Sequence, residues 1–359
     1  MQAGSFWWRL MLFEKEMINM VTDRRNTFDK ILLRFNTGFI LVLMLLAGFA
    51  IEARGQVISG RVVDSETGDA VSFTSVYLSG TTVGTVSCEN GEFELDISRH
   101  PSIPLTVSAI GYSSVTLGEI SPGEFLEVSL TPRLYEITPV DISTRSLERA
   151  RRANLRVFRN QLLGRTSYAR RCEILNEEDI TFNYGSDRDT LIAYALKPLQ
   201  IRNDALGFMI TFHLERFEFY RKTGTVLYTG TFIFQDSAAG SSGRLQERRR
   251  KNTYHGSIMH FFRALWENDL TARGFSVQDQ VGNFLSKEDI VIKENGQKYL
   301  MNRGDLTVNY FDNSSYIRFL EYRVPFEESG YFDPLAIMLT GEMGKKRVGD
   351  ALPIGFVPR

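Results

Sequence analysis

The sequence contains few of the residues that build metal centres and disulfide frameworks. Only two cysteines, Cys88 and Cys172, and four histidines occur among 359 residues. Two cysteines so far apart in the chain form neither a local disulfide framework nor a zinc knuckle. Lys and Arg number 42 against 43 for Asp and Glu, so the chain as a whole does not attract nucleic acid. We therefore expect no metal ion, no cofactor and no nucleic-acid partner.

Local catalytic motifs are missing as well. There is no Gly-x-Ser-x-Gly, and Gly240-Ser241-Ser242-Gly243 is one residue short of that nucleophile elbow. No Gly-x-x-x-x-Gly-Lys-Ser/Thr occurs, which removes the sequence argument for nucleotide binding. The chain is therefore expected not to be an enzyme, and the alternative is a hydrolase whose active site has no local motif.

An apolar run of residues 38–51, GFILVLMLLAGFAI, lies near the start of the chain. It is shorter than the roughly 20 residues of a membrane-spanning helix, and Arg24, Arg25, Lys30 and Arg34 precede it. Small residues follow it, which predicts a secretory signal cleaved between Gly55 and Gln56. The alternative is an uncleaved membrane anchor. Residues 1–55 are thus assigned to a signal peptide with a long N-terminal extension, in which Met17 and Met20 are alternative starts.

From Gln56 onward the hydrophobic period changes to two, which is typical of half-buried strands. Aromatic residues make up 12% of the chain and prolines number only 10, a composition that suits packed β-sheet. Asn90-Gly91 predicts a type I′ hairpin between strands 83–88 and 92–97. Seven short strands with turns every 8–12 residues describe a small β-sandwich over 56–131.

The glycines and turns of this segment occur in an order that resembles the carboxypeptidase-regulatory-like domain. The resemblance is carried by Ile58-x-Gly60-x-Val62, Asp64-x-x-Thr67-Gly68, Gly80-Thr81, Gly84-Thr85, Gly91-x-Phe93-x-Leu95, Ser108-x-x-Gly111-Tyr112 and Val128-x-Leu130. It implies a transthyretin-like sandwich, common in exported proteins of the Bacteroidetes and often found before TonB-dependent transporters. Ala70-Val71 stands where the family often has proline, and Cys88 where it usually has an acidic residue, so a shared surface site in these loops is not implied.

The family name suggests two functions that the residues do not support. A metallocarboxypeptidase takes two zinc ligands from one His-x-x-Glu loop, and none of His100, His213, His255 and His260 begins such a motif. We interpret His213 as a strand histidine, while the spacing of His255 and His260 leaves a metal pair as the alternative. After a linker at 132–145, too few residues remain for the 22-stranded barrel of a transporter.

The remainder, 146–359, is predicted to be an α+β domain with an antiparallel sheet and two main helices. The helices are expected at 146–163 and 257–273, from apolar residues that recur at three and four. Two long strands, 208–220 and 225–234, are expected to pair, and a change of phase between Phe212 and Phe217 predicts a bulge. Part of this domain resembles an uncharacterised region that follows the sandwich in exported Bacteroidetes proteins. The resemblance is carried by the segment from Cys172-Glu173-Ile174-Leu175-Asn176 through Ala205-Leu206-Gly207, with Tyr254-His255-Gly256-Ser257 and Leu352-Pro353.

Several charged or reactive groups in this domain admit two interpretations. Arginines fill much of helix 146–163, and 248–251 reads Arg-Arg-Arg-Lys within a predicted loop at 237–251. Both are interpreted as solvated, with binding to an anionic membrane surface as the alternative. Glu177, Glu178 and Asp179 are read as a turn, whereas Asn183, Asp187 and Asp189 are compatible with calcium. Cys88 and Cys172 are expected to be buried free thiols, with a disulfide between them as the alternative.

These patterns predict an exported envelope accessory protein, in the periplasm or at the outer membrane. Its sandwich is expected to be a docking module for an envelope protein, or alternatively to bind a glycan or peptide.

Overall fold

The computed structural model divides the chain into two compact units, Met1–Gly55 and Gln56–Arg359. It describes residues 56–118, 120, 123, 125–132, 144–186, 188–195, 197–237 and 243–358. The predicted signal and nearly all of the predicted linker therefore lie outside the described residues. No helix among the described residues is both long and apolar enough to cross a bilayer.

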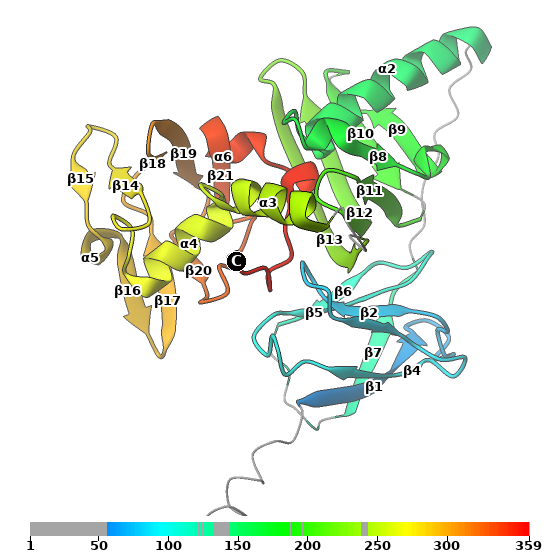
Figure 1. The fold of residues 1–359 in the computed structure, drawn as a ribbon. Coiled ribbons are helices and arrows are strands. Elements are labelled where there is room, and N and C mark those ends of the chain that lie inside the picture. The colour runs from blue at the N-terminus through cyan, green and yellow to red at the C-terminus, as the bar shows by residue number, and fades with distance from the viewer. Residues whose placement is uncertain are drawn as a thin grey trace, which may run out of the picture. The chain divides into compact units, whose positions relative to one another are not determined.

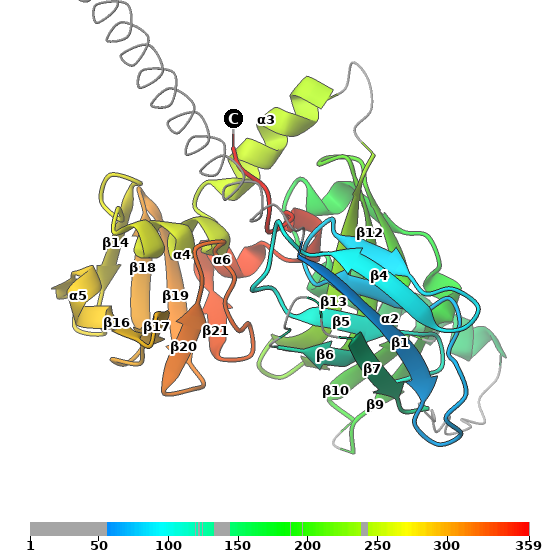
Figure 2. The same cartoon turned by 90° about the horizontal axis from the view of Figure 1, so that it is seen from below.

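The first part of the larger unit is a seven-stranded β-sandwich (Figure 1), as predicted. One sheet has the order β4-β1-β7, and the other has the order β3-β2-β5-β6. The strands are β1 (Val57–Asp64), β2 (Ser75–Leu78), β3 (Gly84–Val86), β4 (Glu92–Asp96), β5 (Leu105–Ser108), β6 (Val115–Leu117) and β7 (Phe125–Leu130). The strict alternation of β4 places Phe93 and Leu95 in the core between the sheets. Figure 2 shows β1 between its partners β4 and β7, of which β7 is parallel to it.

The predicted hairpin at Asn90-Gly91 is wrong. Its two strands, β3 and β4, belong to different sheets, so the turn crosses from one sheet to the other. Gly91 has a φ of 76°, and a Cβ there would lie 2.5 Å from the carbonyl oxygen of Val62. The amide of Val62 donates to the carbonyl of Gly91 at 2.9 Å. This close contact fixes the turn against β1, and only glycine fits it.

A third sheet follows, with the order β8-β11-β12-β10-β9. Its sixth strand, β13, pairs with the edge of β12 that β10 and β11 leave free. Helix α2 (Thr144–Leu162) lies over this sheet (Figure 1). Its side chains Phe158 and Leu162 are buried in the core of the sheet. The strands β12 and β13 pair along their whole length and shift register between Leu214 and Arg216, which confirms the predicted bulge. The strands are β8 (Cys172–Ile174), β9 (Ile180–Tyr184), β10 (Thr190–Ala195), β11 (Leu199–Asn203), β12 (Phe208–Tyr220) and β13 (Thr225–Asp236).

The last part has its own hydrophobic core, built around α4 (Ile258–Glu267). Helix α4 ends at Asn268, whose left-handed φ of 61° lets its amide cap the helix, so the helix is shorter than predicted. Two antiparallel sheets contribute to this core, with the orders β15-β14-β18-β19-β21 and β16-β17-β20. Their strands are β14 (Phe275–Gln278), β15 (Phe284–Leu285), β16 (Val291–Glu294), β17 (Gln297–Met301), β18 (Leu306–Tyr310), β19 (Asn313–Phe319), β20 (Arg323–Phe326) and β21 (Ile337–Thr340).

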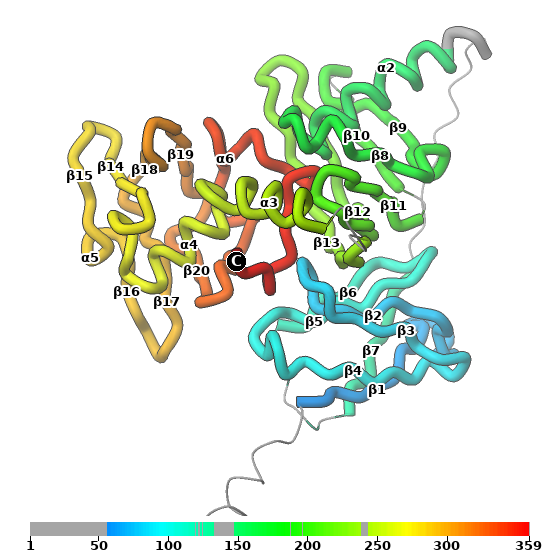
Figure 3. The backbone as a smooth tube through the Cα atoms, viewed as in Figure 1, coloured from blue at the N-terminus to red at the C-terminus, as the bar shows by residue number. Residues whose placement is uncertain are grey.

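Three short helices complete the fold. Residues predicted as a loop form most of α3 (Gly243–Tyr254), and α6 (Gly341–Lys345) follows β21 directly. The third is α5 (Lys287–Ile290). After α6 the chain returns to the sheet of β8–β13 (Figure 3), where the amide of Gly349 donates to the carbonyl of Leu163 at 2.9 Å.

Candidate functional site

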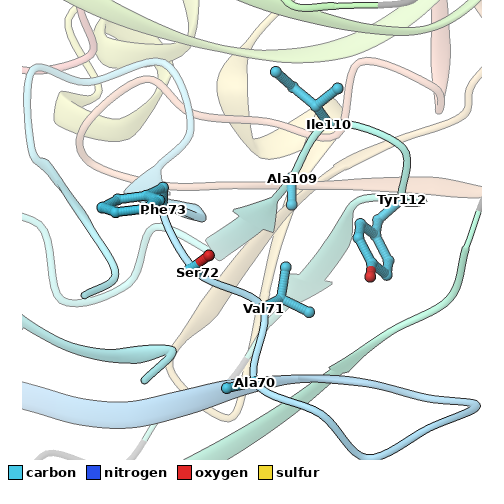
Figure 4. Close-up of a pocket in the computed structure, with 7 residues that line it drawn as sticks. All are labelled: Ala70, Val71, Ser72, Phe73, Ala109, Ile110 and Tyr112. Atoms are coloured by element: carbon cyan, nitrogen blue, oxygen red, sulfur yellow. The ribbon is translucent and has the colours of Figure 1, made fainter. Parts of the chain in front are cut away.

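A pocket of about 350 Å³ opens on the sandwich between two of its loops. Seven residues line it (Figure 4): Ala70, Val71, Ser72, Phe73, Ala109, Ile110 and Tyr112. The first four come from the segment between β1 and β2, and the other three follow β5. None of these side chains carries a charge at neutral pH, and polar atoms contribute more of the exposed lining than apolar atoms, so the pocket suits an uncharged group.

Hydrogen bonds hold both walls of the pocket in place. The amide of Val71 donates to the carbonyl of Val62, and the hydroxyl of Tyr112 donates to a carboxylate oxygen of Asp64 at 2.8 Å. The other oxygen of Asp64 accepts the amides of Glu66 and Thr67. These amide bonds and the Tyr112 hydroxyl lower the pKa of Asp64 below its usual value. The Tyr112 hydroxyl is therefore already committed to a wall contact rather than to a ligand.

Two large apolar side chains stand exposed beside the pocket. Phe73 is 67% exposed and Ile110 is 64% exposed. Phe73 also has a φ of 53°, which is unusual for a residue with a bulky side chain. Strained backbone of this kind is found disproportionately at binding sites. The pocket lies in the loops where the sequence departs from the family pattern at Ala70-Val71, and the analysis of periodicity did not predict it.

A second candidate site is buried where the sandwich meets the sheet of β8–β13. The loop after β2 pairs with β13: the amide of Gly80 donates to the carbonyl of Phe232 at 2.7 Å, and the amide of Phe234 donates to that of Thr81 at 3.0 Å. The amide of Ile354 donates to the carbonyl of Gly80 from the C-terminal segment. This junction therefore joins three distant parts of the chain through their backbones.

Polar side chains meet inside the same junction. The hydroxyl of Ser108 lies 2.7 Å from Nδ1 of His213, and the hydroxyl of Tyr77 is hydrogen-bonded to that of Thr231. The rings of Tyr77 and His213 stack with their centroids 5.3 Å apart. Burial lowers the pKa of His213 to about 4 and raises the pKa of Tyr77. His213 is therefore neutral at pH 7.

The contact between Ser108 and His213 does not have the geometry of an accessible nucleophile. Ser108 is 4% exposed and His213 is 7% exposed, so a substrate has no path to the hydroxyl. Nε2 of His213 is buried without a hydrogen-bond partner among the described residues, so no carboxylate there orients the ring. We interpret the pair as a structural contact, which agrees with the reading of His213 as a strand histidine.

The other histidines are placed as follows. His255 and His260 lie edge to face with ring centroids 5.3 Å apart. Nδ1 of His260 accepts the amide of Gly256, and burial lowers the pKa of His260 to about 4. His100 lies apart, beside Gly355. Within the described ranges, no three His, Cys, Asp or Glu side chains are grouped so that they could hold a metal ion.

The carboxylates and cysteines considered as metal ligands or nucleophiles lie in separate places. Glu177–Asp179 form a short 3₁₀ turn, as read from the sequence. Asp189 pairs with Lys222 at 2.5 Å, whereas Asp187 lies outside the described residues. Both cysteines are free thiols, as predicted, but neither is fully buried, since Cys88 is exposed and Cys172 is half-buried. Burial raises the pKa of Cys172 to about 12, which makes its thiol a poor nucleophile.

Two residues of the basic run at 248–251 are used inside the fold, whereas Arg248 and Lys251 are exposed, as predicted for the run. The Arg250 guanidinium is buried, where it donates to both carboxylate oxygens of Asp236 at 2.9 Å and to the carbonyls of Leu206 and Gly207. Arg249 donates to the carbonyl of Ala205. The run therefore anchors α3 to the turn between β11 and β12.

Comparisons with known proteins bear on the sandwich. Residues 58–131 match the CarboxypepD_reg-like domain family. The match covers the sandwich and not the rest of the chain, and it agrees with the resemblance seen in the sequence. No curated protein matches the chain.

One solved structure similar to this chain is from Bacteroides fragilis NCTC 9343. Its crystal structure is described as that of a membrane-associated protein of unknown function. The two chains are 11% identical, the match covers 80% of this chain and 94% of the other, and the TM-score is 0.17. So low a TM-score supports no statement about the present chain.

Proposed function

We propose that this chain is an exported, non-enzymatic protein of the cell envelope whose sandwich binds a partner protein. The partner inserts an apolar side chain into the pocket beside Phe73 and Ile110. The match of 58–131 to a regulatory-like domain favours a binding module over a catalytic one.

The observation that carries this proposal is the pairing of an uncharged pocket with two exposed apolar side chains. Burying such side chains contributes about 25 cal/mol per Å² of apolar surface removed from water. Exposed apolar groups at the rim of a pocket therefore favour association with another apolar surface. Phe73 additionally holds a strained conformation that its own packing does not require, since most of its side chain is in solvent.

The lining favours a protein partner over a glycan. Sugar recognition depends on several polar side chains that hydrogen-bond hydroxyl groups, and only Ser72 and Tyr112 in the pocket have hydroxyls. Tyr112 is engaged with Asp64. A cavity of about 350 Å³ is large enough for one leucine-sized or aromatic side chain.

Export is the second part of the proposal, and the sequence of 1–55 supports it. Sequencing the N-terminus of the protein recovered from the envelope is expected to give a start at or near Gln56. Recovery of the protein from the cytoplasm with an intact start at Met1, Met17 or Met20 would overturn this part alone.

The pocket is tested with small probes on the purified protein. N-acetylleucinamide is expected to shift the methyl NMR signals of Ala70, Val71 and Ala109 in a saturable way, whereas N-acetylglycinamide is not. Ile110→Ser is expected to lower the affinity for N-acetylleucinamide by roughly tenfold, because about 1.4 kcal/mol of apolar contact is lost. Phe125→Ser is the matched control, since Phe125 is 61% exposed on the same sandwich but outside the pocket.

Two results would overturn the proposal that the pocket binds an apolar side chain. The first is an absence of saturable shifts with the leucine probe. The second is an equal loss of affinity in Ile110→Ser and Phe125→Ser, which would mean that the probe adsorbs to exposed apolar groups in general.

A further inference from the structure

Helix α2 carries a row of arginines on the face that points away from the sheet. Arg149, Arg152 and Arg156 are spaced by three and four residues, so their side chains lie along one side of the helix. All three are exposed, whereas Phe158 and Leu162 are fully buried against the sheet. The row extends over about 10 Å of helix at about 1.5 Å per residue.

The other arginines of this helix have partners inside the protein. Arg151 donates to the carbonyls of Glu177 and Ile180, and Arg159 pairs with the carboxylate of Glu177. Arg152 makes only a long contact with the carbonyl of Glu148 on its own helix. Across the described ranges, no carboxylate forms an ion pair with the three arginines of the row. Their charge is therefore available to an external anion.

Helix stability does not account for this distribution of charge. Acidic residues in the first turn stabilise a helix through its dipole, and α2 has none there. Its net charge is instead positive from the second turn onward. The excess is also local, because positive and negative residues nearly balance over the whole chain.

The N-terminal end of α2 extends beyond the strands that its C-terminal half covers (Figure 1). Residues 147–150 are all exposed, and Leu147 lies on the opposite side of the helix from the arginine row, in line with the buried Asn154 and Phe158. An exposed row of basic side chains of this kind attracts anionic lipid headgroups, at about 1 kcal/mol for each arginine near the membrane surface.

We propose that the face of α2 defined by Arg149, Arg152 and Arg156 binds the anionic headgroups of a lipid bilayer. The guanidinium groups bind phosphate oxygens with paired hydrogen bonds. The run at 248–251 does not provide this surface, because Arg249 and Arg250 are used within the fold. The proposal shares no residue with the pocket of the sandwich, so each can fail alone.

The test uses the purified full chain and vesicles of phosphatidylcholine with or without about one third phosphatidylglycerol. Binding to the anionic vesicles is expected to exceed binding to the neutral ones at about 0.1 M NaCl and to lose this excess at about 1 M, where charges are screened within roughly 3 Å. The triple variant Arg149→Gln, Arg152→Gln, Arg156→Gln is expected to lower the charge-dependent affinity by roughly 100-fold, at about fivefold for each arginine.

The matched control replaces three exposed arginines elsewhere, Arg99, Arg188 and Arg303, with glutamine. This control has the same net charge as the test variant and is expected to keep most of the affinity. A second readout is the fluorescence of an environment-sensitive label at Ala153→Cys in a Cys88→Ser background. Quenching by headgroup-labelled lipid is expected on anionic vesicles and is expected to be lost in the triple variant.

If the two triple variants lost equal affinity for the anionic vesicles, the proposal would be overturned, because the net charge alone would then determine binding. An unquenched label at position 153 on bound protein would overturn it as well, since another part of the chain would make the contact. Tighter binding of a short DNA duplex than of anionic vesicles, lost in the α2 variant, would assign the face to nucleic acid instead.

Discussion

Ser108 and His213 lie 105 residues apart in the sequence and are hydrogen-bonded at 2.7 Å, one from the sandwich and the other from β12. Thr231 lies opposite His213 in the β12–β13 pair. Its hydroxyl is hydrogen-bonded to the hydroxyl of Tyr77, which belongs to the sandwich. Two side chains of the sandwich thus meet two neighbouring side chains of the sheet of β8–β13. The contact joins the two parts through buried polar groups whose protonation affects stability.

The free energy of unfolding is expected to fall between pH 6.5 and pH 4 because of His213. Burial lowers its folded pKa to about 4, whereas an unfolded histidine titrates near 6.5. The contribution is therefore complete above pH 6.5 and is lost as the unfolded chain takes up the proton. Its size is on the order of 3 kcal/mol between the two limits. Urea unfolding at pH 7.5 and 4.5 measures it.

His213→Gln isolates this residue from His260, whose pKa is lowered to a similar value. The variant is expected to be less stable at pH 7.5 and to lose less stability on acidification than the parent chain. An unchanged pH slope in His213→Gln would contradict the assignment of the acid sensitivity to the junction.

Tyr77→Phe and Thr231→Val each remove one partner of a buried hydrogen bond. Each is expected to lower the free energy of unfolding by about 1–2 kcal/mol, because the remaining group is left buried and unpaired. The double variant is expected to lose less free energy of unfolding than the two single variants lose together. The difference, which a double-mutant cycle measures as the coupling of the two side chains, is expected to be about 1 kcal/mol. Additive losses would mean that the two hydroxyls do not stabilise the junction together.

Local patterns predicted the strands well and the contacts between distant segments poorly. Alternation of apolar residues predicted the sandwich, and the change of phase between Phe212 and Phe217 predicted the bulge of β12. The Asn90-Gly91 signal correctly marked a turn, but the sheet that each flanking strand joins depends on contacts with β1. Helix α3 has a mostly polar composition without a clear apolar stripe, and it is fixed by the burial of Arg250.

The pocket was not predicted either, because it too depends on contacts between distant segments. Its two walls, 70–73 and 109–112, come from loops that are nearly forty residues apart in the sequence, and no periodic pattern connects them. An exposed Phe73 within a turn segment is a weak signal that becomes informative only with its positive φ. The pairing of Ser108 with His213 is equally invisible without the fold.

Phe73→Asn is expected to stabilise the protein or leave it unchanged. Asparagine tolerates positive φ better than phenylalanine, and the mostly exposed ring contributes little packing. We expect a gain of up to about 1 kcal/mol in the free energy of unfolding. The control Phe125→Asn is expected to lower it, because Phe125 begins strand β7, where asparagine is unfavourable. A loss above 1 kcal/mol for Phe73→Asn would make Phe73 a structural residue rather than a binding one.

Arg250→Ala is expected to lower the free energy of unfolding by about 2–3 kcal/mol, because the carbonyls of Leu206 and Gly207 lose a buried charged donor. Arg248→Ala changes an exposed side chain of the same helix and is expected to stay within about 0.5 kcal/mol of the parent. Chemical denaturation of both variants in the same buffer and at the same temperature compares their free energies of unfolding. Similar losses for both would refute the anchoring role of Arg250.

The central claim, a protein-binding pocket on the sandwich, is tested most directly in living cells. A photo-reactive phenylalanine analogue replaces Phe73 in one variant and Phe125 in another, and both are irradiated in the native host. We expect a discrete protein adduct at position 73 that Ile110→Ser removes, and no such adduct at position 125. Equal adducts at both positions, or an adduct at position 73 that survives Ile110→Ser, would contradict it.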